Sequence, residues 1–334
     1  MNNICIFYSS EAQKGIINGF RSLKYSVNEK YFGIEKSHYT FLQLILVRIS
    51  QLVLGNKSTI ICLYNYRLLE LLISKSKFDF ILIIKPSKVL TIFRKHINTI
   101  FNDTKIILWT TDSAVRYPEQ LELKSKAFFT FVQDGNDIQA IGKSKWLPLG
   151  FNNEYFYKTS TRKEIDILLI GNCREEQYKT RSNYFVEASK LASQGFRVVF
   201  VGSNLIEHKR KILLENGVVI LSPVTPKELS NFIKKSRICI NIHQDDGGMT
   251  INPMFFAIPA CGTFQITDNR LYLSNWLIPL VHFTPLTLEN LNGRIIKLLE
   301  ANNLSVSNIE YLEKHSFVSR AEEILKIVNS DQNV

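Results

Sequence analysis

The fold of this chain is decided by one strand, helix, strand unit in its C-terminal half. The first strand reads Ile165-Asp-Ile-Leu-Leu-Ile-Gly171, a helix is expected over residues 181–194, and the second strand reads Arg197-Val-Val-Phe-Val-Gly202. Two short apolar runs joined by a helix are typical of neighbouring strands in a parallel sheet. The unit therefore predicts an α/β domain.

The same alternation of short apolar runs and longer amphipathic ones continues on both sides of this unit. Downstream, it predicts a helix that Thr225 caps, over residues 226–235, and strands over 218–221, 238–242 and 264–267. Upstream, it predicts a helix over residues 41–55 and strands over 4–8, 59–63, 80–84, 105–109 and 128–132. A last helix is expected over residues 319–328, because its apolar positions share one face.

The predicted organisation is α/β throughout, with two Rossmann-like, doubly wound domains in series. The polar run Lys158-Thr-Ser-Thr-Arg-Lys-Glu164 separates the two series of strands. We therefore expect an N-terminal domain over residues 1–157, a second domain over 158–315 and a C-terminal helical segment over 316–334. A length of 334 residues fits two domains of about 150 residues each.

The composition is that of a folded protein with an uneven distribution of charge. Hydrophobic residues make up 45% of the chain and charged residues 21%, which excludes a disordered or fibrous protein. The net charge is +11, and residues 1–150 hold 20 basic and 11 acidic side chains, whereas residues 151–334 hold 21 and 19. The basic excess therefore belongs to the N-terminal half.

The cysteines and the apolar segments indicate a cytoplasmic protein. The five cysteines are scattered, with no Cys-x-x-Cys spacing, which argues against a disulfide framework and a zinc site. The N-terminal segment lacks the basic region and cleavage site of a signal peptide. The most membrane-like stretch, over residues 41–54, is interrupted by Arg48 and is shorter than the roughly 20 apolar residues that span a bilayer.

The candidate ligand site lies in the loops that follow the strands of the second domain, because open α/β sheets bind ligands outside the carboxyl ends of their strands. One loop reads His243-Gln-Asp-Asp-Gly-Gly-Met-Thr250 and leads to a helix for which Asn252 is a suitable N-cap and Pro253 a suitable first residue. Such a helix start favours a phosphate or diphosphate. The alternative is a flexible surface loop before a well-capped helix.

Two further loops place a glycine directly after a strand. Gly171 is followed by Arg174 and Arg181, which could supply positive charge, and Gly202 is followed by Ser203. Either glycine could also be simple turn punctuation. Together with the loop at 243–250 they favour a nucleotide or sugar-nucleotide site, although neither the dinucleotide fingerprint nor a P-loop is present. The candidate donor-binding residues are Gly171, Arg174, Arg181, Gly202, Ser203, His243, Gly247, Gly248, Met249, Thr250 and Asn252.

The helix after this loop resembles the donor-site helix of bacterial glycosyltransferases of the CgeB-like group, which have the two-domain GT-B fold. The resembling run is Asn252-Pro-Met-Phe-Phe-Ala-Ile-Pro-Ala-Cys-Gly-Thr-Phe-Gln-Ile-Thr-Asp268. Segments that agree with it are Lys105-Ile-Ile-Leu-Trp-Thr-Thr-Asp112, Trp146-Leu-Pro-Leu-Gly150, residues 166–171, Ile240-Asn-Ile-His243 and His315-Ser-Phe-Val-Ser-Arg320. The resemblance covers most of residues 100–328. It implies two domains that face each other across a cleft, with the last helix packed back on the first domain.

This chain departs from the group at two positions of that helix. The group's pattern is similar to Asn-Pro-Arg-x-Phe-Glu-x-x-Ala-Cys-Gly, and the chain has Met254 for the arginine and Ala257 for the glutamate. In the group the glutamate is understood to hold the ribose of the nucleotide. Loss of one hydrogen bond to a charged group costs roughly 1.5–3 kcal/mol, or about tenfold to a hundredfold in affinity.

The resemblance further implies sugar transfer from a nucleotide-diphosphate-sugar co-substrate, with no metal and no other cofactor. A residue of the first domain would deprotonate the acceptor if the reaction inverts the anomeric centre. Asp112 and Glu11, which follow predicted strands, are the candidate bases, although each could be a capping or solvated carboxylate. His243 could be a base, or it could lie beside the phosphate or cap the loop. His38 and His315 are interpreted as structural or surface residues.

The leading interpretation is a glycosyltransferase of bacterial surface polysaccharide synthesis. It would act on a glycan or a lipid-linked acceptor, and the basic N-terminal half could bind an anionic membrane surface at the inner face of the cell membrane. The second interpretation is a GT-B scaffold that has lost catalysis and serves as partner or regulator of another transferase. Nucleic-acid binding is not expected, because the lysines are dispersed and form no known module.

Overall fold

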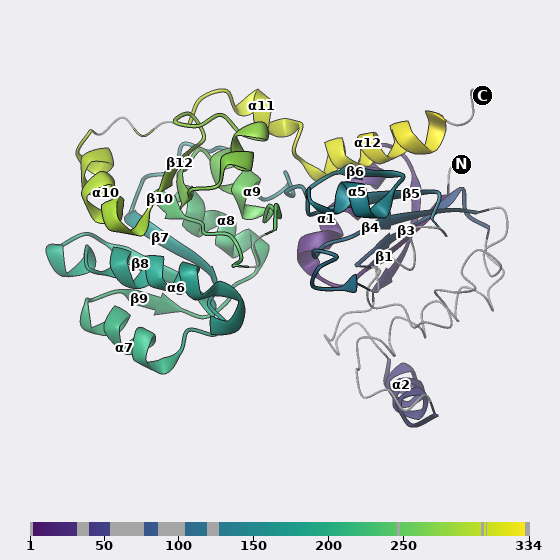
Figure 1. Ribbon diagram of the computed structural model, residues 1–334, viewed down its shortest axis with the longest axis horizontal. Helices are drawn as coiled ribbons and strands as arrows, with labels where there is room; N and C mark the ends of the chain where they lie inside the picture. The colour runs from purple at the N-terminus through teal and green to yellow at the C-terminus, as the bar shows by residue number, and fades with distance from the viewer. Residues whose placement is uncertain are drawn as a thin grey trace. The chain divides into compact units, whose positions relative to one another are not determined.

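The computed structural model describes residues 3–31, 40–53, 77–85, 104–118, 127–245, 248–301, 304 and 306–330. The chain divides into two compact units (Figure 1). Unit 1 comprises Met1–Leu149 and Phe317–Val334, and unit 2 comprises Gly150–Ser316.

The described residues of unit 1 form a six-stranded parallel sheet of order β2-β1-β3-β4-β5-β6. Its strands are β1 (Asn3–Tyr8), β2 (Ser26–Tyr31), β3 (Phe80–Ile84), β4 (Lys105–Trp109), β5 (Phe129–Val132) and β6 (Ser144–Trp146). Its described helices are α1 (Glu11–Ser22), α2 (Phe41–Val53), α5 (Asp137–Ile141) and α12 (Phe317–Ser330). Strand β3 is buried along its whole length, and β1 and β4 are buried at every residue but the first, which explains why they read as continuous apolar runs.

The predicted strands at 4–8, 80–84, 105–109 and 128–132 are confirmed within one residue. The predicted strand at 59–63 lies outside the described residues, and so does the end of the helix predicted over 41–55. Strands β2 and β6 are not predicted by the sequence pattern, because β2 is an edge strand with the sequence Ser-Val-Asn-Glu-Lys-Tyr and β6 has only three residues. Partly exposed edge strands carry no continuous apolar run.

Helix α12 returns from the end of the chain and packs along α1. The contact is close: a Cβ atom at Gly15 would lie 2.3 Å from the ring of Phe317, and one at Gly19 would lie 2.6 Å from the carbonyl oxygen of Phe317. Ala321, Ile324 and Val328 of α12 belong to the same buried core as the central strands. These residues are the apolar stripe that the sequence predicts for the last helix.

Unit 2 contains a second six-stranded parallel sheet, of order β12-β11-β10-β7-β8-β9. Its strands are β7 (Ile165–Asn172), β8 (Val198–Ser203), β9 (Val219–Leu221), β10 (Ser236–Ile240), β11 (Phe264–Asp268) and β12 (Phe283–Leu286). Its helices are α6 (Glu175–Ser189), α7 (Glu207–Glu215), α8 (Pro226–Lys234), α9 (Met254–Ala260), α10 (Leu291–Glu300) and α11 (Ile309–Glu313), with single 3₁₀ turns η4 (Ala192–Gln194), η5 (Leu271–Asn275) and η6 (Leu288–Asn290). The strand order reverses between β7 and β10, so this is the topological switch point.

The predicted fold class is confirmed: two doubly wound, parallel α/β sheets. The helix predicted over 181–194 is corrected, because α6 begins at Glu175 and a separate 3₁₀ turn covers Ala192–Gln194. The backbone of Tyr178 is not helical, with φ −141° and ψ 35°, and this kink hides the first turns of α6 from a search for helical periodicity. In the described part of the chain, no helix has the length and apolar character needed to cross a membrane.

Candidate functional site

The carboxyl ends of β7, β8, β10 and β11 bring together most of the predicted donor-binding residues. Gly171 and Gly202 lie opposite each other on the neighbouring strands β7 and β8. His243 lies three residues beyond the end of β10, and Asp268 ends β11. These residues thus lie at the carboxyl edge of the sheet, where open α/β sheets bind their ligands.

Contacts within the protein explain why glycine occupies both positions. A Cβ atom at Gly202 would lie 2.0 Å from the carbonyl oxygen of Gly171. Gly171 itself has φ +145°, and a Cβ there would lie 2.9 Å from Nη1 of Arg181. Both glycines are thus required by the close packing of the strand ends.

Arg181 joins the ends of β7 and β10. Its side chain is buried, its Nε donates to the carbonyl of Ile242 at 2.9 Å, and its Nη1 donates to the carbonyl of Asn172 at 2.8 Å. The guanidinium also lies over the ring of Tyr178, 4.2 Å from its centroid. Burial lowers the pKa of Arg181. The guanidinium of Arg181 is therefore engaged by main-chain carbonyls and holds the two strand ends in position. The sequence does not reveal this role.

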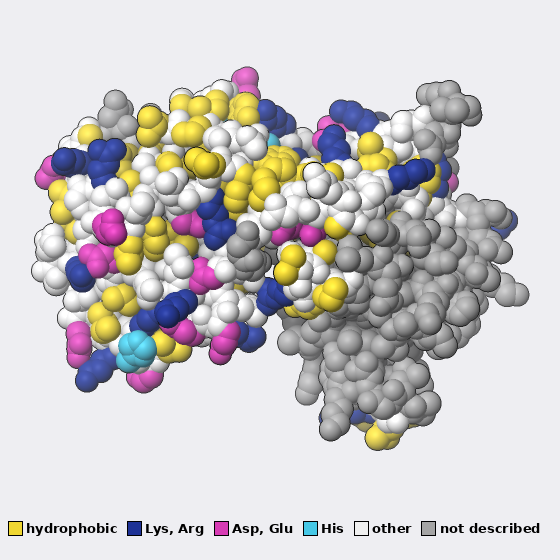
Figure 2. All heavy atoms as spheres, in the orientation of Figure 1, with side chains coloured by type: hydrophobic (Ala, Val, Ile, Leu, Met, Phe, Trp, Pro, Cys, Tyr) yellow, Lys and Arg dark blue, Asp and Glu magenta, His cyan; other side chains and the backbone are white. Residues whose placement is uncertain are grey.

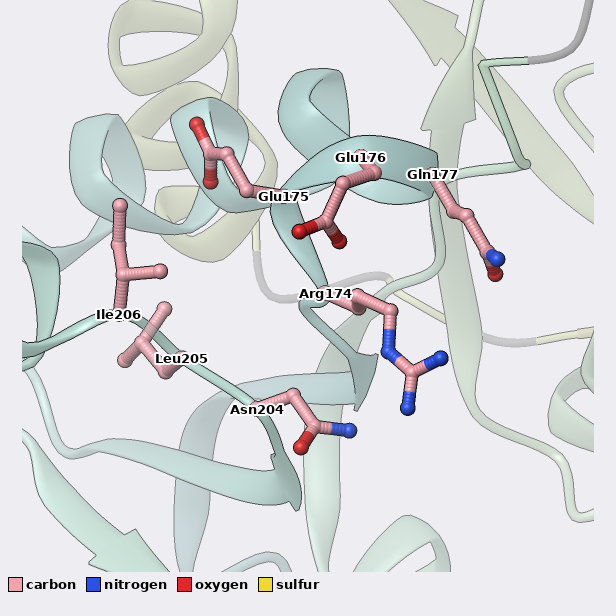
Figure 3. Close-up of a pocket in the computed structure, with 7 residues that line it drawn as sticks. All are labelled: Arg174, Glu175, Glu176, Gln177, Asn204, Leu205 and Ile206. Atoms are coloured by element: carbon pink, nitrogen blue, oxygen red, sulfur yellow. The ribbon is translucent and has the colours of Figure 1, made fainter.

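A pocket of about 550 Å³ opens where α6 begins and β8 ends (Figure 3). In Figure 3 the side chains of Arg174, Glu176 and Gln177 extend from the start of α6, and that of Asn204 from the segment after β8. Asn172 links the two walls, because its Oδ1 accepts from the main-chain N–H of Arg174 at 3.0 Å and from Nδ2 of Asn204 at 2.9 Å. The volume lies within the range of small-molecule sites. The lining residues are Arg174, Glu175, Glu176, Gln177, Asn204, Leu205 and Ile206.

His243 is held by a carboxylate and is fully enclosed. Its Nδ1 lies 2.8 Å from Oδ1 of Asp268, and its main-chain N–H donates to the same oxygen at 3.0 Å. Burial lowers the pKa of His243, while the contact with His243 and the charge of Arg270 hold the pKa of Asp268 far below its usual range against the opposing effect of burial. A neutral imidazole with its proton on Nδ1 satisfies this geometry. The ring of Phe255 makes an edge contact with the imidazole, with 5.6 Å between the ring centroids. His243 therefore supports the loop from inside the protein.

Arg270 and Tyr272, which the sequence analysis did not single out, contact the loop that follows β10. Arg270 forms an ion pair with Asp268 through Nε and donates from its Nη atoms to the carbonyls of Gln244 and Gly248. The hydroxyl of Tyr272 lies 3.3 Å from the carbonyl oxygen of Gly248 and 3.1 Å from that of Thr250. No periodic pattern marks these residues, since they lie in and beside the 3₁₀ turn η5.

The segment before α9 differs by one residue from the prediction. Helix α9 begins at Met254, so Pro253 precedes the helix instead of being its first residue, while Oδ1 of Asn252 accepts from the main-chain N–H of Phe255 at 3.1 Å, as predicted for a capping side chain. Met249 and Thr250 are half-buried and Gly248 is buried, whereas Gly247 lies outside the described residues. Ala257 is fully buried in α9.

The two candidate bases lie in unit 1. Asp112 follows β4 and is half-buried, with Nζ of Lys85 at 3.6 Å and Nη1 of Arg116 at 3.9 Å. Glu11 is the first residue of α1, and its side chain lies outside the described set. The loop that carries Asp112 is anchored by Asp137, whose Oδ2 accepts from the main-chain N–H of Ala114 at 2.8 Å.

Asp137 is a buried carboxyl group that sequence reasoning missed. Burial raises its pKa to about 6, and the neighbouring charge of Asp134 acts in the same direction. Both residues follow β5, a position that also lies at the carboxyl edge of the sheet. A signal was present in the sequence, because two aspartates three residues apart closely follow a predicted strand.

Comparison with known proteins relates this site to a family. Residues 177–326 match the glycosyl transferase-like family, whereas no curated protein matches the chain in sequence. Arg181, His243, Asn252 and Arg270 all lie in the matched region.

Solved structures share the fold over nearly the whole chain. AviGT4, a glycosyltransferase involved in avilamycin A biosynthesis, has a TM-score of 0.65 at 10% identity, over 98% of this chain and 97% of AviGT4. HepE from Anabaena, determined in complex with UDP-glucose, has a TM-score of 0.65 at 12% identity, over 99% and 100% of the two chains. A glycosyltransferase from Rickettsia africae has a TM-score of 0.62 at 13% identity, over 98% of each chain. The protein thus has the GT-B fold of glycosyltransferases, and its C-terminal part matches the glycosyl transferase-like family.

Proposed function

We propose that this protein is a metal-independent glycosyltransferase that transfers a sugar from a nucleotide-diphosphate donor to a hydroxyl group of a glycan or a lipid-linked acceptor. The observation that carries the proposal is the match of residues 177–326 to the glycosyl transferase-like family. Most of these residues belong to unit 2, which also contains the pocket. HepE, which shares the fold, binds UDP-glucose. The segments similar to the CgeB-like group favour that group and a role in bacterial surface polysaccharide synthesis.

The donor site is proposed at the carboxyl edge of the second sheet. Arg174 borders the pocket at the start of α6, where its guanidinium and the helix start would both favour phosphate oxygens. Ser203 ends β8 beside this pocket, and Gly248, Met249, Thr250 and Asn252 lead to α9. Arg181 and His243 act from behind, by holding the strand ends that carry these residues.

The transfer step follows from the chemistry of such a donor. The acceptor oxygen forms a bond to the anomeric carbon while the bond from that carbon to the diphosphate breaks, and the negative charge goes to the leaving diphosphate. Arg174 would stabilise that charge. In an inverting reaction Asp112 is the proposed base that takes the hydroxyl proton, and the nearby Lys85 and Arg116 would favour an acceptor that carries phosphate.

The donor site is tested by calorimetric titration of the purified chain with UDP, GDP, dTDP, CDP and ADP. We expect one nucleotide to bind with micromolar affinity, and Arg174→Gln to weaken it by about tenfold to a hundredfold, because a hydrogen bond to a charged group is worth roughly 1.5–3 kcal/mol. Gly248→Trp should abolish nucleotide binding, because the bulky side chain would fill the space beside this segment. Arg294→Gln, at an exposed position of α10, is the matched control and should leave the affinity unchanged.

A folded protein that binds none of the five nucleotides would favour the second candidate, a scaffold that has lost catalysis. The specific observation behind it is Ala257, which offers no acceptor for a ribose and is fully buried. In the double variant Met254→Arg, Ala257→Glu, a gain in nucleotide affinity would indicate a weakened site, and no gain would indicate a vestigial one. Thermal unfolding must be followed in parallel, because the glutamate enters a buried position.

We also propose that unit 1 binds the inner face of the cell membrane through α2. Thr40 caps this helix, since its Oγ1 accepts from the main-chain N–H of Gln43 at 3.3 Å. Exposed apolar side chains share one face of the helix, where Figure 2 shows hydrophobic groups at the surface: Phe41, Leu42, Ile45, Ile49 and Leu52. The basic excess of the N-terminal half favours anionic headgroups.

Flotation with phosphatidylglycerol vesicles tests this proposal. We expect salt-sensitive binding that Leu52→Asp removes and that phosphatidylcholine vesicles do not support. Leu271→Asp is the matched control, because Leu271 of unit 2 is 89% exposed and Leu52 is 83% exposed. Equal loss of binding in both variants, or no binding by the unmodified protein, would remove the membrane claim.

A further inference from the structure

We infer that Arg270 and Tyr272 are positioning residues that hold the segment Gly248–Thr250 in the shape that binds the donor diphosphate. The inference rests on the proposed function for the identity of the ligand. The contacts themselves belong to the protein and can be tested without a ligand.

Arg270 connects three parts of unit 2 through one planar group. Its Nε pairs with Oδ2 of Asp268 at the end of β11, and its Nη2 donates to the carbonyl of Gln244. Its Nη1 donates to the carbonyl of Gly248 at 3.3 Å and to the hydroxyl of Tyr272 at 3.1 Å. The guanidinium thus bridges a strand end and both sides of the loop, which the fixed fork of arginine can do and a lysine cannot.

Tyr272 extends the same contact along the segment. Its hydroxyl lies within hydrogen-bond distance of two carbonyl oxygens, those of Gly248 and Thr250. A hydroxyl has one proton, so it donates to one of these oxygens at a time while it accepts from Arg270. Arg270 and Tyr272 together direct three carbonyls of the loop, at residues 244, 248 and 250, toward themselves.

The direction in which these carbonyls point affects whether the segment can bind an anion. Carbonyl oxygens repel phosphate oxygens, so a segment that binds a diphosphate must turn its carbonyls elsewhere. The carbonyls of Gln244, Gly248 and Thr250 point toward Arg270 and Tyr272, so these two side chains keep the three carbonyl oxygens from facing a bound anion.

The anchor of this arrangement is Asp268. One of its carboxylate oxygens accepts twice from His243, and the other pairs with Arg270. With a neutral His243, the negative charge of Asp268 balances the positive charge of Arg270 inside the protein. The pair therefore stays in place without contributing net charge, and Arg270 acts through the segment instead of binding phosphate itself.

The other end of the loop has its own attachment, to the kink of α6. Oδ2 of Asp245 accepts from the main-chain N–H of Thr180 at 2.9 Å, and the main-chain N–H of Asp245 donates to the carbonyl of Gln177 at 3.1 Å. These contacts surround Tyr178, the non-helical residue of α6. Loss of Arg270 should therefore release the Gly248–Thr250 side of the loop while the Asp245 side remains attached.

Hydrogen exchange and nucleotide titration of Arg270→Gln and Tyr272→Phe test the inference, with Arg237→Gln as the matched control. Arg237 pairs with Asp166 at 3.2 Å and donates to the carbonyl of Leu299, so it makes similar contacts in the same unit. It lies at the start of β10, at the opposite edge of the sheet. A general loss of stability would affect both arginine variants alike.

We expect amide exchange at residues 248–251 to speed up at least tenfold in Arg270→Gln and several-fold in Tyr272→Phe, and to stay unchanged in Arg237→Gln. Nucleotide affinity should fall at least tenfold in Arg270→Gln and several-fold in Tyr272→Phe. Compared with Arg270→Gln, the variant Arg270→Lys should recover part of the thermal stability but little of the nucleotide affinity. Unchanged exchange in Arg270→Gln and Tyr272→Phe, or equal effects in Arg237→Gln, would overturn the inference. If Arg270→Gln fails to fold, Tyr272→Phe, which removes a single hydroxyl, still decides it.

The two proposals fail separately. If the unmodified protein binds no nucleotide, the proposed function fails, whereas the exchange rates still report whether Arg270 and Tyr272 hold the segment. If the protein binds a nucleotide with equal affinity in all four variants, the donor site stands and the positioning role is wrong.

Discussion

Gly202 lies at a position of unit 2 that leaves no room for a side chain. It lies opposite Gly171 in the paired strands, and a Cβ would lie 2.0 Å from the Gly171 carbonyl oxygen, which belongs to the backbone and cannot rotate aside. We expect Gly202→Ala to lower the free energy of unfolding by about 3 kcal/mol or more, as strained core substitutions do. Denaturant unfolding of unit 2 measures this.

Gly293 provides the opposite case. It lies inside α10, and a Cβ atom at this position would meet open space, with no neighbouring atom of the described residues within 4 Å. Gly293→Ala should therefore raise stability by about 0.5–1 kcal/mol through the helix preference of alanine. Equal effects of the two substitutions would contradict the packing argument for Gly202.

Asp137 should make unit 1 less stable as the pH rises. Its pKa is about 6 in the folded protein, mainly because it is buried, against about 3.9 in an unfolded chain. The folded state therefore binds the proton more tightly, and the resulting stability is complete below pH 4 and is lost as the pH rises through 6. Asp137→Asn keeps an acceptor for Ala114 and cannot ionise.

The measurement is thermal unfolding of both proteins between pH 4 and pH 8. As the pH rises from 4 to 8, the free energy of unfolding of Asp137→Asn should increase by about 2–3 kcal/mol relative to that of the unmodified protein, since one pKa unit corresponds to about 1.4 kcal/mol. A difference that is constant with pH would show that Asp137 is ionised throughout.

Among the elements, α8 shows how a few local contacts define a helix start. Oγ1 of Thr225 accepts from the main-chain N–H of Glu228 at 3.3 Å, and the Glu228 carboxylate accepts from the main-chain N–H of Thr225 at 2.8 Å. This is the reciprocal capping box, and it confirms the cap predicted from the sequence.

Thr225→Ala should cost about 1 kcal/mol of stability, because an orphan N–H loses its acceptor. Thr225→Ser keeps the hydroxyl and should cost only a few tenths of a kcal/mol. Urea unfolding of the two variants distinguishes them, and an equal loss in both would assign the effect to the methyl group of threonine instead of the cap.

For the whole molecule, unit 1 is built from two separate segments of chain and unit 2 from one. Phe317, Ala321, Ile324 and Val328 of α12 complete the core of unit 1 although they follow unit 2 in the sequence. Residues 1–149 alone would expose this part of the core to water, at a cost of roughly 25 cal/mol per Å² of apolar surface.

We therefore expect residues 150–316 to fold as an isolated fragment and residues 1–149 to lack a cooperative unfolding transition. Addition of a peptide of residues 317–330 should restore that transition. Circular dichroism and one-dimensional NMR of the fragments follow both effects, and cooperative unfolding of residues 1–149 without the peptide would contradict the role of α12.

The sequence by itself determined the fold class, most of the strands in the described regions, the capping contacts of Thr225 and Asn252 and the grouping of the candidate site residues at one sheet edge. These features are local: a buried parallel strand is a continuous apolar run, and a cap needs only its own helix start. The resemblance of the Asn252–Asp268 run to glycosyltransferases is likewise a property of one continuous stretch, and the GT-B fold agrees with it.

Only the tertiary structure decided what the polar side chains at that edge contact. The order of the strands places β7 beside β10 and β10 beside β11, which brings Arg181 to the carbonyl of Ile242 and Asp268 to His243. The contacts of Arg270 and the kink of α6 were likewise decided only by the tertiary structure. Periodicity reports which residues are buried, whereas the partner of a buried polar group depends on which distant segment the fold places beside it.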